Sequence, residues 1–128
     1  HQPPARLIEA LESVGERSAT VTARVPADSP HCRDDRLMEA AHLELMAQAA
    51  AALHGYRTRI RQTSARPPGG MLVGARDFAV LAPLHPGDAL TISLRKEARL
   101  GAFGVLTTEI RRGDALVSRA ELKTWQED

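Results

Sequence analysis

The chain has 128 residues, 43% of them hydrophobic and 26% charged, a composition typical of one soluble globular domain, here expected to span residues 1–128. The net charge of +1 and the few aromatic residues (one Trp, one Tyr and two Phe) argue against a nucleic-acid partner. The single cysteine, Cys32, cannot form an internal disulfide, which favours the cytoplasm, and no apolar run reaches the ~18 residues that span a bilayer.

The chain begins with two segments that favour extended structure. They cover Leu7–Ser13 and Ala19–Val25 and are separated by a turn at 15–17. In the second segment small or branched apolar residues alternate with Thr and Arg, the period of a half-buried strand. The beginning of the first segment is equally compatible with a short helix.

A polar loop, PADSPHCRDDR, then leads into a helix predicted from Arg36 to His54, with Asp34 or Asp35 as its cap and Gly55 as its end. Most of its positions are Ala, Leu or Met, so no face is clearly hydrophilic, and we expect a helix buried on all sides at the centre of the domain. Two polar residues, Glu44 and Gln48, lie one turn apart in its middle. Burial of a carboxylate is costly, so a functional reason is expected for it.

The rest of the chain predicts a loop and then strands. Residues 57–70 are rich in Arg, Pro and Gly, which favours an exposed loop. Beyond them lie the predicted strands MLVGARDFAVLA, ALTISLRKEARL, FGVLTTEIRR and ALVSRAELKTW, with turns at HPGD, at Gly101 and at Gly113–Asp114. The last three strands predict an antiparallel meander.

Two strands, one apolar helix and a strand meander predict an α+β domain in which a curved antiparallel sheet wraps around one long central helix of ~28 Å. One helix cannot cover a wide sheet and its edges. We therefore expect a dimer.

Four motifs in this order resemble the hotdog-fold 3-hydroxyacyl-acyl-carrier-protein dehydratases of the FabZ and FabA type, and most of all the divergent ApeP-like dehydratases of aryl-polyene clusters. They are the opening stretch His1–Ile8, the ELMAQ sequence Glu44–Gln48, the strand Met71–Phe78 and the PGD turn Pro86–Asp88. The resemblance covers nearly the whole chain.

The resemblance implies a single hotdog domain that dehydrates 3-hydroxyacyl thioesters to trans-2-enoyl thioesters in fatty-acid or polyene-type synthesis, without a cofactor or metal. It implies His31 as the base and Glu44 as the residue that positions or protonates the leaving hydroxyl, contributed by opposite subunits of a homodimer or heterodimer. Gln48, Gly74 and Arg76 would bind the substrate. The partner would be an acyl carrier protein with its 4'-phosphopantetheine-linked acyl chain, met by arginines of the 57–66 region and by Arg76.

Other interpretations remain open. The family's GHFPG loop is absent, and His31 stands one residue from the position of its histidine, which favours a catalytically degenerate hotdog subunit that pairs with an active one. A hotdog thioesterase also uses a helix carboxylate, but the ELMAQ and PGD motifs disfavour it. Within one chain His42 cannot pair with Glu44, because two residues along a helix place their side chains on opposite faces. For Cys32 a plain loop cysteine is favoured over a nucleophile.

Overall fold

A computed structural model describes residues 8–61 and 70–126. Six strands form one antiparallel sheet in the order β1-β2-β6-β7-β8-β5, and two short strands form a separate hairpin, β3-β4. The elements are β1 (Ile8–Val14), β2 (Ser18–Arg24), β3 (Cys32–Arg33), β4 (Arg36–Leu37), α1 (Glu39–Arg61), β5 (Gly70–Val80), β6 (Ala89–Leu100), β7 (Phe103–Arg112) and β8 (Ala115–Gln126).

The predicted meander is confirmed in β6, β7 and β8, which pair in antiparallel registers with one irregularity in each pair, between Lys96 and Ala98 and between Ile110 and Arg111. The turns between them contain Gly101 and Gly113, with φ of 59° and 61°, a left-handed conformation that glycine adopts without steric cost. The first two extended segments are also strands, so the helical alternative for the beginning of the chain is wrong over the described residues.

The helix differs from its prediction at both ends. Asp34 and Asp35 do not cap it: both have positive φ, 50° and 64°, and form the two-residue turn of the β3–β4 hairpin, as a type I′ turn requires. Consequently α1 begins at Glu39, three residues later than predicted. It then continues through Gly55 to Arg61, since an internal glycine costs a helix only about 1 kcal/mol. Residues 57–61 are therefore helical, while 62–69 and 1–7 lie outside the described residues.

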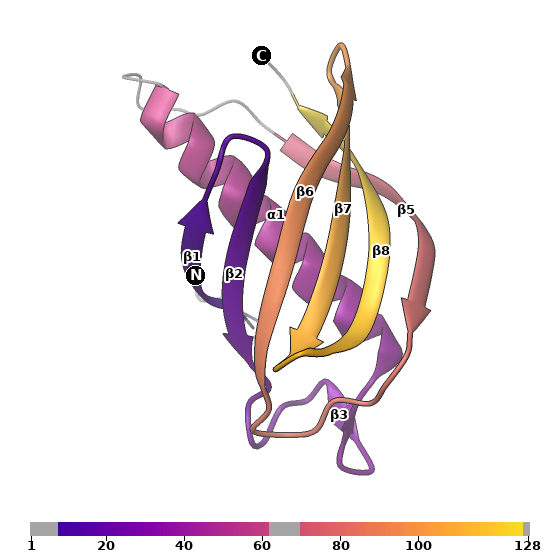
Figure 1. Ribbon diagram of the computed structural model, residues 1–128. Coiled ribbons are helices and arrows are strands. Elements are labelled where there is room, and N and C mark those ends of the chain that lie inside the picture. Colours follow the sequence, from indigo (N-terminus) through magenta and orange to yellow (C-terminus); the bar gives the residue numbers. More distant parts are fainter. Residues whose placement is uncertain (1–7, 62–69, 127–128) are drawn as a thin grey trace.

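Helix α1 lies across one face of the curved sheet (Figure 1). The core forms where apolar residues of this face meet one side of the helix, and its fully buried members include Val21, Ile92, Leu122, Leu45 and Met46. Burial in β2 alternates residue by residue, as expected when one face of a strand packs and the other does not.

The opposite side of the helix is not covered by residues 8–61 and 70–126. Glu39, Ala40, Glu44, Ala51 and Tyr56 are exposed along α1. The prediction of a helix buried on all sides is thus wrong for the single chain, because the sheet covers only one of its faces. Glu44 is an exposed carboxylate here, not a buried one.

Strand β5 is an edge of the sheet, paired only with β8. Its register is interrupted twice, between Leu72 and Gly74 and between Arg76 and Ala79. At the second interruption Asp77 has φ of 56°. Both Leu72 and Val73 are exposed, so this edge presents apolar side chains beside backbone groups that no other described strand pairs.

Candidate active site

His31 lies where the β3–β4 hairpin meets the start of α1. Its backbone N–H donates to Ser29 Oγ at 3.1 Å, and its carbonyl accepts from the N–H of Met38 at 2.8 Å, one residue before the helix. The imidazole is half-buried, and its Nε2 atom is buried with no hydrogen-bond partner among the described residues. His31 therefore lies beside the start of the helix, with a ring nitrogen that no described residue bonds.

Glu44 and Gln48 form a polar pair on the uncovered side of the helix. Gln48 Nε2 donates to Glu44 Oε2 at 3.4 Å, the contact expected between residues one turn apart. An amide donor at this position orients the carboxylate. The structure therefore brings together two of the predicted site residues on a face that a second molecule can reach.

Gly74 and Arg76 lie elsewhere, on the edge strand β5. They line a hollow of about 440 Å³ on the face of the sheet opposite to the core. The orientation follows from the register, because Gly74 and Arg76 pair with Lys123 and Glu121, which alternate with the buried Leu122. The complete lining is Gly74, Ala75, Arg76, Ala98, Arg99, Phe103, Val105, Glu121 and Lys123.

This hollow, which we call the outer hollow, is lined by apolar residues, which form its floor, and by charged residues, which form its walls. Arg76 Nε donates to Glu121 Oε1 at 2.6 Å, and the Lys123 ammonium lies 4.9 Å from the centre of the Phe103 ring. The bond to Glu121, and the charge of that carboxylate, raise the pKa of the Arg76 guanidinium. Neither His31 nor Glu44 contributes to the lining. The predicted site residues thus form separate groups within one chain.

A buried histidine lies two residues before Glu44, on the opposite side of the helix. His42 is fully buried against the sheet, and its Nδ1 lies 2.9 Å from Ser118 Oγ on β8. Its Nε2 has no partner among the described residues. Burial lowers the pKa of His42, outweighing the charge of Glu39, so the ring is neutral. His42 and Glu44 point to opposite faces, as the helical period predicts.

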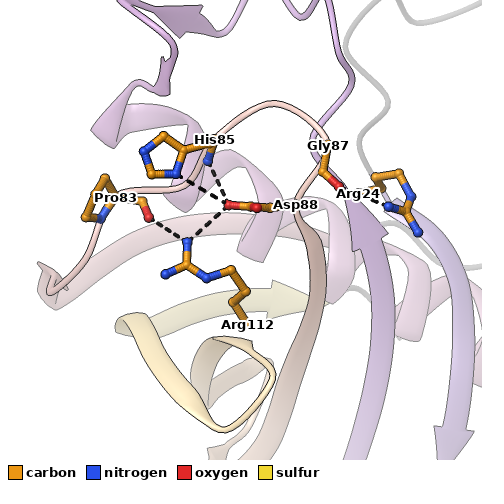
Figure 2. A network of polar contacts seen from close by, with 6 residues as sticks. All are labelled: Arg24, Pro83, His85, Gly87, Asp88 and Arg112. Carbon is orange, nitrogen blue, oxygen red and sulfur yellow. Dashed lines mark hydrogen bonds and ion pairs between the residues drawn. The ribbon is translucent and has the colours of Figure 1, made fainter.

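The PGD turn contains a polar network that the sequence did not reveal (Figure 2). Asp88 Oδ2 accepts from the backbone N–H of His85 at 2.8 Å and from Arg112 Nη1 at 3.1 Å. Arg112 Nη1 also donates to the carbonyl of Pro83 at 3.0 Å. Partial burial opposes ionisation of Asp88, but these donors and the charge of Arg112 hold its pKa below the usual value. No local signal couples Asp88 to an arginine 24 residues away.

Cys32 follows His31 but lacks the features of a nucleophile. Burial, and then the carboxylate of Asp35, raise the pKa of its thiol against the opposing bond to Ser29, so it is protonated at neutral pH. Over residues 8–61 and 70–126, no group of three or more His, Cys, Asp or Glu side chains is arranged to hold a metal ion. Within the same residues no helix is long and apolar enough to cross a membrane.

One long helix packed on an antiparallel sheet with this strand order is a hotdog fold, and solved structures support the assignment. The chain aligns over its full length with 87% of a chain of the dehydratase heterocomplex ApeI:P from Xenorhabdus doucetiae, with a TM-score of 0.83 and 25% identity. It is also similar to an uncharacterized protein from Pyrococcus horikoshii, with a TM-score of 0.74, 15% identity and coverage of 95% of this chain and 85% of the other.

A hypothetical thioesterase with coenzyme A from Streptococcus pneumoniae has a TM-score of 0.74 and 14% identity, over 92% of this chain and 84% of that one. At such identity this likeness concerns the fold alone. The family model of the ApeP-like proteins, described as ApeP dehydratase, matches residues 1–128. The chain therefore belongs to the ApeP-like family of hotdog dehydratases. A search of curated proteins gave no match.

Proposed function

We propose that this chain takes part in the dehydration of 3-hydroxyacyl-acyl-carrier-protein thioesters to trans-2-enoyl thioesters. The observation that carries the proposal is the placement of two groups suited to this reaction. Glu44 lies on the exposed face of α1, and His31 lies at the start of the same helix, with an Nε2 atom that no described residue bonds. Family membership supplies the reaction class.

The reaction requires one proton to leave carbon and one to reach oxygen. His31 Nε2 would accept the proton from the α-carbon, and the electron pair would form the new double bond as the C3–O bond breaks. Glu44, in its protonated form, would give its proton to the departing hydroxyl, which leaves as water. The first-turn N–H groups of α1 would stabilise negative charge on the thioester oxygen.

The site would be completed by a second hotdog subunit. Within the described residues no hydrogen bond or ion pair joins His31 to Glu44, and Glu44 lies with Gln48 on the exposed side of the helix. The exposed edge of β5, with Leu72 and Val73, offers backbone pairing beside that face. A dimer that covers both features would remove Glu44 from bulk solvent. The similarity to a chain of a dehydratase heterocomplex supports a heterodimer over a homodimer.

The proposed donor of the substrate is an acyl carrier protein whose acyl chain is bound to 4'-phosphopantetheine. Arg76, Arg99 and Lys123 place three cationic groups around the outer hollow, against the single carboxylate of Glu121. Cations at a hollow with an apolar floor suit an acidic protein that carries a phosphate-linked arm. Gly74 leaves its floor open, since no atom lies within 4 Å of the position of an added Cβ. We further propose a cytoplasmic location and aryl-polyene synthesis as the pathway.

A second candidate is a subunit that pairs with an active partner but supplies only Glu44 or a wall of the substrate tunnel. The absence of the family's glycine-flanked histidine motif favours it. Both candidates are tested by one assay. The purified chain, alone and with candidate hotdog partners, is mixed with a 3-hydroxyacyl-acyl-carrier-protein, and the enoyl product and free thiol are followed by mass spectrometry.

Matched variants assign the residues. Loss of enoyl product in both His31→Ala and Glu44→Gln, with Glu12→Gln on β1 as the control for an exposed carboxylate, supports the pair proposed here. Product that requires a partner and survives His31→Ala supports the second candidate. Release of free thiol without enoyl product would instead identify a thioesterase.

A further inference from the structure

We propose that Arg112, together with Asp88, is a positioning residue that sets the geometry of His31 and of the α1 start. The inference rests on the proposed function, since it concerns the same site. It begins from Figure 2, in which one guanidinium nitrogen of Arg112 bonds both the Pro83 carbonyl and the Asp88 carboxylate.

These contacts fix the segment on both sides of Leu84. Arg112 holds the carbonyl of Pro83, and Asp88 holds the backbone N–H of His85. Leu84 itself is fully buried. Three consecutive residues are therefore held by two charged side chains from outside and by one apolar side chain in the core.

The fixed segment in turn holds the site. The Leu84 carbonyl accepts from the N–H of Leu37 at 2.7 Å, and the next N–H, that of Met38, donates to the His31 carbonyl at 2.8 Å. Leu37 and Met38, which make these two bonds, directly precede Glu39, the first residue of α1. A short series of hydrogen bonds thus leads from Arg112, at the end of β7, to the backbone of His31. Displacement of a catalytic group by about 1 Å can lower a rate ~100-fold.

The network also has a defined charge state. Arg112 and His85 are the charged or titratable groups that face Asp88, from β7 and from its own turn. Arg24 reaches the same turn through the Gly87 carbonyl at 2.9 Å, without contacting Asp88. Asp88 is thus ionised and bound to Arg112 throughout the neutral range. This ion pair, together with the bond from Arg112 to the Pro83 carbonyl, is what we call the clamp, and it is intact at neutral pH.

The test compares Arg112→Ala and Arg112→Lys with Arg111→Ala, a neighbouring arginine of β7 that pairs with Glu109 at 3.0 Å. Amide hydrogen exchange of Leu37 and Met38 is measured by NMR. Steady-state kinetics are measured with the chain alone or with the chain bound to a hotdog partner, whichever makes enoyl product. We expect exchange at these two amides to rise at least about tenfold in Arg112→Ala, with the lysine variant restoring part of the protection and Arg111→Ala unchanged.

In the same variants kcat should fall about 10–100-fold in Arg112→Ala with little change in KM, because Arg112 does not line the outer hollow proposed to bind the substrate. If Arg112→Ala does not fold, Arg112→Lys and Asp88→Asn decide by the same readouts. Equal exchange in the two alanine variants overturns the proposal. So does faster exchange with an unchanged kcat, which would make the clamp purely structural. If no form of the wild type makes enoyl product, the proposed function fails, and the clamp is then judged on exchange and on the NMR signals of the His31 ring.

Discussion

Acidification should destabilise this fold through His42. Its ring is fully buried, Nδ1 is shared with Ser118 Oγ, and Nε2 has no partner among the described residues. Protonation would make both ring nitrogens donors and would place a charge in the core, where Nε2–H has no acceptor. Burial accordingly lowers the pKa of His42 from its ordinary value of 6.5.

The sign and size of the effect follow from proton linkage. Because the unfolded chain binds a proton at a higher pH than the folded chain, stability is fully present above 6.5 and is lost as the pH falls toward the folded pKa. One proton changes the free energy of unfolding by at most about 1.4 kcal/mol per pH unit. Against a typical total of about 5–15 kcal/mol, a slope of this size is measurable.

Urea denaturation from pH 8 to pH 5, at one fixed protein concentration, measures this slope. The wild type should lose stability below pH 6.5, whereas His42→Leu should give a flatter curve over the same range. His54→Gln, on the same helix but partly exposed, is the control and should follow the wild type. Parallel curves for the wild type and His42→Leu below pH 6.5 would refute the assignment of the acid sensitivity to His42.

Three further changes have defined outcomes. Alkylation of Cys32 should be slow at neutral pH and accelerate in alkali, because its pKa is raised, and Asp35→Asn should speed it; equal rates in both proteins would contradict a contribution of that carboxylate. Leu45→Ala removes a core side chain that is 1% exposed and should lower the free energy of unfolding by about 2–5 kcal/mol in urea titrations. A decrease below about 1 kcal/mol would show that the neighbouring side chains relax to fill the cavity. Ala51→Lys should leave the chain folded by circular dichroism yet reduce the oligomer mass measured by light scattering; an unchanged mass would place the interface elsewhere.

The second half of the fold could be predicted closely from the sequence because its signals are local. In β6, Leu90, Ile92 and Leu94 alternate with polar residues, and glycines with positive φ stand where the chain turns. The helix start could not be placed by the same means. Asp34 and Asp35 favour a helix cap and a type I′ hairpin turn alike, and their two-residue hairpin is held by the Leu37–Leu84 bond, whose partner lies 47 residues along the chain.

The candidate site divides in the same way. Residues one turn apart, Glu44 and Gln48, could be predicted to meet because the helix alone brings them together. The partners of Arg76 and Asp88 depend on strand registers and on a turn packed against β7, which no local pattern encodes. The network of Arg112 was missed for this reason.

A comparison of His42 with Glu44, both near the centre of α1, also explains why the burial of this helix was predicted wrongly. Apolar composition shows that a helix face becomes buried, but not whether the cover comes from the same chain. His42 lies under the sheet of its own chain and is neutral, whereas Glu44, two residues on, lies on a face with small apolar neighbours and no cover. If a second subunit supplies that cover, the completion of the site around Glu44 depends on assembly. Dehydration should then fall with dilution more steeply than the folded fraction does, and activity measured across the dissociation range would reveal it.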